Sequence, residues 1–164
     1  MLSRSKRQVS YEFFKKLYKL TLGGGVVFWV TTIATSLLPI AAEYRAHFTN
    51  WRPQTVWVAS LLMGMIIGCC VSYALLRFLE KNPTRNPIQK STLLSFIALV
   101  IAIILIDVPQ SFLLPGSRDA LYFFLIGVMF NAARFLLLGI VIGYLYKRLY
   151  GSTSAQVVGI GLPG

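Results

Sequence analysis

Four long runs of apolar residues alternate with short polar or basic segments along the chain. A helix of about 20 apolar residues is long enough to cross the hydrocarbon core of a bilayer. The runs predict transmembrane helices at about 21–42, 55–78, 87–108 and 119–147. We therefore expect an all-α membrane protein in which residues 1–150 form one domain, a bundle of four transmembrane helices.

The segment before the first run is polar but has one apolar face. Val9, Phe13 and Leu17 are spaced four residues apart, so a helix places them on the same side. Five basic residues surround this face: Lys6, Arg7, Lys15, Lys16 and Lys19. This pattern predicts an N-terminal basic amphipathic helix in the membrane interface, in contact with anionic lipid head groups. Docking of a protein partner is the alternative interpretation.

Local signals mark several boundaries. Asn86 precedes Pro87, which is the arrangement of an N-cap followed by proline at the first helical position, so the third helix should begin at Pro87. Pro39 should kink the outer end of the first helix, and residues 43–54 should form a polar loop. Residues 151–164 carry no charged side chain and contain several glycines, which predicts a flexible cytoplasmic tail.

Two pairs of glycines are spaced to allow close helix packing. Gly64 and Gly68 lie in the second helix, and Gly139 and Gly143 lie in the fourth. These two helices run in the same direction, so the motifs could pack on each other within one chain. They could also form the seam of a homodimer.

A weak internal repeat is visible between the two halves of the chain. Thr21-Leu22 and Thr92-Leu93 open the first and third helices, and Pro39 and Pro109 lie near the ends of those helices. These pairs are offset by 71 and 70 residues, and the glycine pairs by 75. Two helical hairpins in the same orientation would form a parallel repeat.

The basic residues are distributed unevenly around the apolar runs, in a chain of net charge +11. Twelve of the sixteen lie in the N-terminal segment, in the connection between helices two and three, or at the C-terminal end. Three lie in the other two connections. The positive-inside rule therefore predicts a multi-pass protein of the plasma or inner membrane with both termini in the cytoplasm. Because the basic residues flank apolar runs, we expect no nucleic-acid binding.

Polar residues deep inside the runs are the candidates for function. The last unassigned basic residue, Arg134, and the acidic Asp107 lie roughly 20–25 Å from the cytoplasmic flanks at 1.5 Å per residue. An ion pair between them is predicted because a charge at this depth needs a partner. Asn131 shares a face with Arg134, and a hydroxyl-bearing face of the first helix should complete the hydrogen bonds: Thr31, Thr32, Thr35 and Ser36.

The chain contains no recognisable catalytic, cofactor-binding or metal-binding motif, so we expect neither an enzyme nor a cofactor. Cys69 and Cys70 are adjacent and are interpreted as packing residues. We expect an accessory or scaffold subunit that acts through helix packing, as a homo-oligomer or in a larger membrane complex. The alternative is a small oligomeric transporter or channel for an anion, a proton or a small polar solute. This alternative would use Asp107, Asn131 and Arg134.

Overall fold

The computed structural model describes residues 2–48, 52–81, 86–109, 112 and 120–158. The described elements are α1 (Leu2–Ser36), α2 (Pro39–Phe48), α3 (Pro53–Lys81), α4 (Pro87–Ala102), a π-helical turn η1 (Ile103–Asp107) and α5 (Ala120–Val158). Four stretches are long and apolar enough to cross a membrane: Ser10–Ser36, Pro53–Phe78, Pro87–Asp107 and Ala120–Tyr150. The chain is therefore a multi-pass membrane protein, and the expected bundle of four long apolar helices is confirmed.

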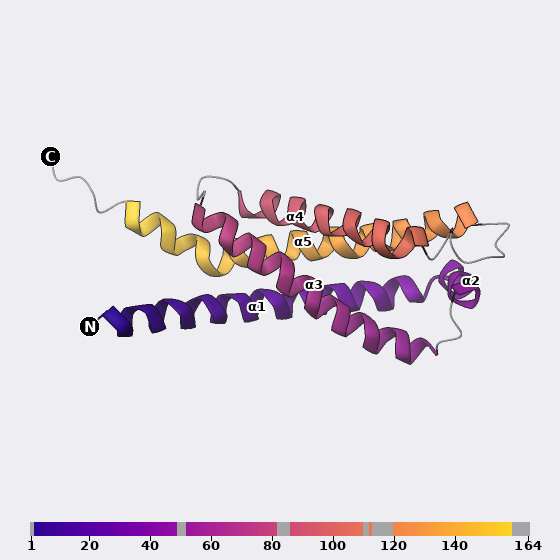
Figure 1. Ribbon diagram of the computed structural model, residues 1–164, viewed down its shortest axis with the longest axis horizontal. Coiled ribbons are helices and arrows are strands. Elements are labelled where there is room, and N and C mark those ends of the chain that lie inside the picture. Colours follow the sequence, from indigo (N-terminus) through magenta and orange to yellow (C-terminus); the bar gives the residue numbers. More distant parts are fainter. Residues whose placement is uncertain (1, 49–51, 82–85, 110–111, 113–119, 159–164) are drawn as a thin grey trace.

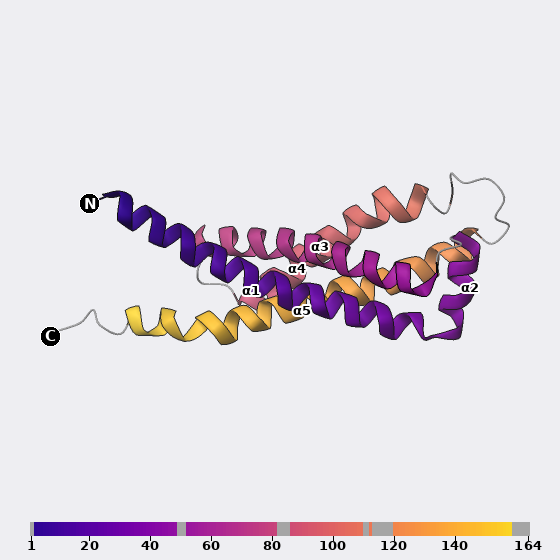
Figure 2. The same cartoon turned by 90° about the horizontal axis from the view of Figure 1, so that it is seen from below.

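The four long helices run alternately in opposite directions, and both termini lie at the same end of the bundle (Figure 1). We call this the basic end and the opposite end, which α2 crosses, the α2 end. Helix α1 packs along α3 and α5, and α4 packs along α5. Helices α3 and α4 meet over a shorter length and separate toward the α2 end (Figures 1 and 2).

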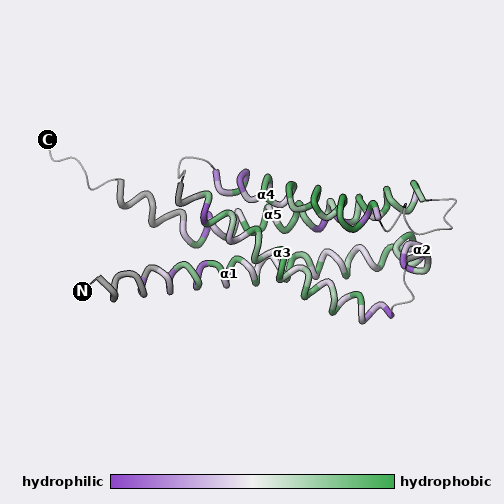
Figure 3. The backbone as a smooth tube through the Cα atoms, in the orientation of Figure 1, coloured by the Kyte–Doolittle hydropathy of each residue, from purple (hydrophilic) through white to green (hydrophobic). Residues whose placement is uncertain are grey.

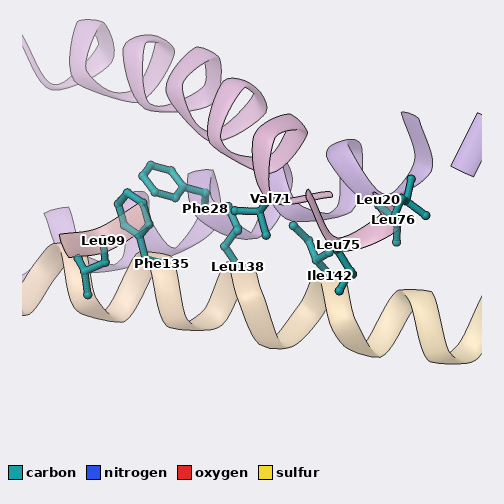
Figure 4. Close-up of a cluster of buried hydrophobic side chains, with 9 residues drawn as sticks. All are labelled: Leu20, Phe28, Val71, Leu75, Leu76, Leu99, Phe135, Leu138 and Ile142. Atoms are coloured by element: carbon teal, nitrogen blue, oxygen red, sulfur yellow. The ribbon is translucent and has the colours of Figure 1, made fainter. Parts of the chain in front are cut away.

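The core is a line of apolar side chains along the centre of the bundle (Figure 4). Leu75, Leu138 and Ile142 are fully buried there. Phe28 and Phe135 meet edge to face, with ring centroids 5.7 Å apart. Many apolar side chains also point outward, and polar positions gather toward the helix ends (Figure 3). Outward apolar side chains suit a bundle whose solvent is lipid hydrocarbon.

The glycine pairs bring neighbouring helices into close contact within the chain. A Cβ atom on Gly68 would lie 3.2 Å from the carbonyl oxygen of Thr21, so α3 packs directly on the backbone of α1. A Cβ atom on Gly143 would lie 2.5 Å from the Cα atom of Ile88, so α5 packs directly on α4. Gly64 and Gly139 face these same partners. Each motif thus packs on the preceding long helix, which is neither of the two arrangements considered from sequence.

The contacts of these glycines support the hypothesis of a repeat. Gly68 lies beside Thr21, and Gly139 lies beside Thr92. Gly68 and Gly139 are 71 residues apart in the sequence, and so are Thr21 and Thr92. Near the α2 end, Ser36 bonds to α3 and Asp107 bonds to α5, and these two residues are also 71 apart. The hairpins α1–α3 and α4–α5 are therefore built alike.

The N-terminal segment differs from the expected separate interfacial helix. It is continuous with the first membrane span, and the resulting α1 runs without a break from Leu2 to Ser36. No proline interrupts the chain near residue 20, and burial of Gly24 against Ile142 of α5 and of Gly25 against Met65 of α3 offsets the low helix propensity of glycine. The helix ends at Ser36, earlier than expected, because Pro39 starts α2. Residues 43–48 are accordingly helical and not a loop.

The other helix boundaries follow the sequence more closely. Asn86 caps α4 as predicted, because its Oδ1 atom accepts a hydrogen bond from the Ile88 backbone N–H at 3.2 Å. The expected flexible tail at 151–164 is wrong for its first part, since α5 continues to Val158. No proline stops the helix before Pro163. Residues 159–164 lie outside the described part of the chain.

Candidate intramembrane polar site

Three elements bring the predicted polar residues together toward the α2 end. Asp107 is the last residue of η1 and is only 4% exposed. The side-chain amide of Asn131 on α5 donates to both carboxylate oxygens of Asp107, at 3.1 and 3.0 Å. The amide oxygen of Asn131 accepts from Nη1 of Arg134 at 3.4 Å. Nη2 of Arg134 donates to the hydroxyl of Thr35 on α1 at 3.3 Å.

Asp107 and Arg134 are therefore joined through Asn131. The predicted direct ion pair is wrong in this respect, because the described contacts of the Asp107 carboxylate are to the Asn131 amide. Asn131 is one turn before Arg134 on α5, so its amide can reach both charged groups at once. Sequence spacing placed Asn131 beside the pair but gave no sign that it would lie between the two charges.

The π turn positions Asp107. Buried residues on α4 recur every four residues at Ser91, Ser95 and Leu99. In an α-helix each step of four residues rotates a side chain by about 40°, so this face would drift away from α5. A π turn holds more residues than an α turn, and it offsets the drift so that Asp107 points back into the bundle. The sequence carries no clear signal for this turn.

The hydroxyl groups of α1 contribute less to the cluster than expected. Thr31 and Thr32 donate to backbone carbonyls of their own helix, at 2.7 and 2.9 Å, and their described hydrogen bonds do not reach Arg134. Thr35 donates to the carbonyl of Thr32 and accepts from Arg134. Ser36 donates to its own helix and accepts from the indole N–H of Trp57 at 3.1 Å. Of these four described hydroxyl groups, the one that bonds directly to Arg134 is that of Thr35.

Two residues of α2 complete the site, and sequence analysis missed both because this segment was expected to be a loop. Nη1 of Arg45 donates to the backbone carbonyl of Ser36 at 3.3 Å. The carboxyl end of a helix carries partial negative charge, which favours a guanidinium there. Tyr44 packs edge to face on Phe130. Burial, reinforced by the nearby Asp107 carboxylate, raises the pKa of Tyr44 to about 12, so the phenol stays neutral. The signal available in the sequence was Pro39, a favoured first residue of a helix.

A pocket of about 670 Å³ opens beside this cluster. It lies where α3 and α4 diverge and receives side chains from all four long helices and from α2. Its polar lining residues are Thr32, Ser36, Tyr44, Arg45, Ser60, Asn131 and Arg134, and most of the remaining lining is apolar. Among the described residues, the lining includes two arginines and no carboxylate. The charged side chains in the described lining are therefore both cationic.

The hydrogen-bonding capacity of Arg134 is only partly used. A guanidinium carries five N–H donors. Two long contacts engage Nη1 and Nη2, both with neutral acceptors, and Nε is buried with no hydrogen-bond partner among the described atoms. An unsatisfied buried donor is costly. This arrangement can hold an anion, because an anion supplies the hydrogen-bond acceptors that the guanidinium lacks.

Other candidate residues lie away from the pocket. Lys15 and Lys19 are exposed at the basic end, and the Lys16 ammonium lies 5.0 Å from the centre of the Tyr150 ring. Lys6 and Arg7 belong to α1, but their side chains lie outside the described structure. Cys69 and Cys70 are free thiols, and Cys70 lines the pocket. Within the described ranges, no three His, Cys, Asp or Glu residues are grouped as metal ligands would be.

Comparison of the chain with protein-family models, with curated proteins and with solved structures finds no match. Inferences about function therefore depend on the geometry of this chain.

Proposed function

We propose that this membrane protein binds a small anionic solute in the pocket beside Arg134, and that it acts in binding or transport without catalysing a reaction. The observation that carries the proposal is the pocket itself, which reaches a guanidinium whose donors are incompletely satisfied. A purely structural lock between helices would be expected to pair its charges directly, since an isolated buried charge is expensive.

The charge balance of the lining supports the same proposal. The described hydrogen bonds connect Asp107 to Arg134 through the neutral amide of Asn131, and Asp107 is not among the described residues that line the pocket. Arg45 adds a second positive charge, held at the end of α1 by the carbonyl of Ser36. Intramembrane charges that face a cavity commonly mark the path of an ion or a polar solute. An anion that enters this pocket meets two cationic side chains.

The orientation of the protein in the membrane is part of the proposal. The basic end contains the segments that carry most of the lysine and arginine residues. The positive-inside rule then places this end in the cytoplasm and the pocket in the outer half of a plasma or inner membrane. Single-cysteine variants in a Cys69→Ser, Cys70→Ser background would test the orientation with an impermeant thiol reagent. Labelling from outside at position 43, but not at position 15, is expected.

The binding proposal is tested by titrating the purified protein with a panel of anions: chloride, sulfate, phosphate, acetate and palmitate. The wild-type chain is compared with Arg134→Gln and with Arg52→Gln as a matched control. Arg52 is exposed near the α2 end and does not line the pocket, and its replacement removes the same charge. At least one anion should bind the wild type and the control but bind Arg134→Gln more weakly. The absence of Arg134-dependent binding across the panel would refute the proposal.

An accessory role is the second candidate, supported by a separate feature at the basic end. Tyr11, Phe14 and Tyr18 lie on one face of α1 and are 63–67% exposed. Aromatic residues of this kind are enriched in protein interfaces. Purification in mild detergent with native mass spectrometry should then yield a stoichiometric partner, which replacement of all three residues by serine should release. Recovery of the wild-type protein alone would count against this role.

A further inference from the structure

The pocket is lined mainly by apolar residues, and most of its polar groups are concentrated in the part nearer the α2 end. Its lining on α3 runs from Val56 to Cys70, which spans roughly 21 Å at 1.5 Å per residue. The side nearer the α2 end carries the hydroxyls of Ser36 and Ser60 and the guanidinium of Arg45. The side nearer the middle of the bundle is lined mainly by apolar residues: Phe28, Ile66, Ile67, Ala98 and Phe135. Arg134 and Asn131 lie between the two parts.

The pocket also opens sideways, toward lipid. Met63 and Ile66 on α3 line it and are 44% and 59% exposed. Across the opening, Ile101 and Leu105 from α4 and η1 line it and are 52% and 68% exposed. All four positions fall within membrane-spanning stretches, so their exposed surfaces face hydrocarbon. A molecule can therefore enter between α3 and α4 directly from the membrane.

We propose that the occupant of this pocket is a single-chain amphiphile, with one anionic head group beside Arg134 and a hydrocarbon chain in the apolar part. This inference rests on the proposed binding of anions and names their class. The charge of the lining selects the anionic head, and the lateral opening admits the chain. A volume of about 670 Å³ is typical of sites for a single small ligand, which favours one chain over a two-chain phospholipid.

The head group, and not the chain, determines affinity at this site. The chain moves from lipid hydrocarbon into an equally apolar pocket, so its transfer provides little driving force. The head group gains hydrogen bonds from donors of Arg134 that are otherwise unused, and both partners of these bonds are ionised. Removing the guanidinium should therefore weaken binding by about tenfold to a hundredfold, the range expected for one charge-assisted hydrogen bond. Shortening the chain by two carbons should change binding far less.

The test measures binding of radiolabelled palmitate to the full chain in nanodiscs of neutral phosphatidylcholine. Wild type and Arg52→Gln should bind palmitate saturably, and Arg134→Gln should bind it about tenfold to a hundredfold more weakly. Hexadecanol, which has the chain without the charge, should compete poorly. Arg134→Lys keeps the charge, so partial rescue by this variant separates loss of binding from loss of folding.

A second variant probes the chain-binding part. Ile66→Trp enlarges an exposed residue at the opening, so it should narrow the entrance without disturbing the core. This variant should weaken palmitate binding and leave any binding of inorganic phosphate unchanged. Equal palmitate binding by wild type and Arg134→Gln would overturn the inference. Arg134-dependent binding of phosphate without binding of palmitate would overturn it too, but would leave the proposed binding of anions standing. Absence of both would overturn the inference, and absence of Arg134-dependent binding of every anion in the panel would refute both proposals.

Discussion

The amide bridge between Asp107 and Arg134 makes a quantitative prediction for a double-mutant cycle. The two charged groups contact Asn131 at 3.0 and 3.4 Å on opposite sides of its amide, so they are farther apart than the partners of a direct salt bridge. Coulomb's law with an effective dielectric constant of 20 gives about 2 kcal/mol for unit charges roughly 7 Å apart, against about 4 kcal/mol for contact at 4 Å. We therefore expect a coupling energy of about 2 kcal/mol between Asp107→Asn and Arg134→Gln.

The cycle can be measured as free energies of unfolding in mixed detergent micelles, followed by circular dichroism during titration with sodium dodecyl sulfate. The double variant should be more stable than the sum of the single losses predicts, because removing both charges leaves neither one unpaired. Arg77→Gln at the basic end provides the control. Arg77 lies in the last turns of α3, at the basic end, and Asp107 ends η1 toward the α2 end, so the effect of Arg77→Gln should add to that of Asp107→Asn.

A third single variant tests the bridge directly. Asn131→Leu removes the donor to Asp107 and the acceptor for Arg134 together, so it should cost more stability than either charge replacement alone. Losses at Asp107 and Arg134 that add within about 0.5 kcal/mol would refute the coupling. A coupling of about 4 kcal/mol would also refute the bridged geometry, because it would require direct contact between the charges.

Three further predictions concern packing, capping and pH. Gly143→Ala should destabilise the bundle by about 1–3 kcal/mol in thermal melts, because the new methyl group would meet the α4 backbone. Gly23→Ala should cost little, since the methyl group would meet only the tip of a flexible side chain. Asn86→Ala should cost about 1 kcal/mol in the same assay, and Asn86→Ser should retain most of the capping. The pKa of Tyr44 is raised from its ordinary value of 10.0 to about 12 in the folded protein. The folded state therefore holds the phenol proton of Tyr44 more strongly than the unfolded state does. The free energy of unfolding should decrease as the pH rises from 10.0 to about 12, and Tyr44→Phe should remove that decrease.

The number and approximate positions of the membrane-spanning helices could be predicted because bilayer thickness fixes the length of an apolar run. Boundaries were predictable where a side chain acts on the local backbone, as Asn86 does at the start of α4. The continuity of α1 was not predictable, because Gly24 and Gly25, which have low helix propensity, are held by contacts with α5 and α3. Those contacts join residues distant in sequence, so the local pattern could not reveal them.

The residues of the polar site could be predicted from the sequence, but their contacts could not. Asp107, Asn131 and Arg134 stood out because each is a costly residue inside an apolar run, and the structure brings all three together. The order in which they contact one another depends on the π turn that positions Asp107, and sequence spacing alone does not predict this turn. Arg45 was missed because its helix, α2, was taken for a loop. The pocket depends on the divergence of two helices and so has no signature in either helix alone.

The two hairpins are most informative where they differ. If they were related by strict symmetry, α3 would lie along α4 as closely as α5 lies along α1, and the space beside Arg134 would be filled by packing. The divergence of α3 from α4 leaves that space open (Figures 1 and 2). At the equivalent position near the α2 end, the first hairpin carries the neutral Ser36 and the second carries the charged Asp107. A neutral contact suffices to hold helices together. The charge and the opening both break the symmetry and occur together, which supports the proposal that a solute binds beside Arg134.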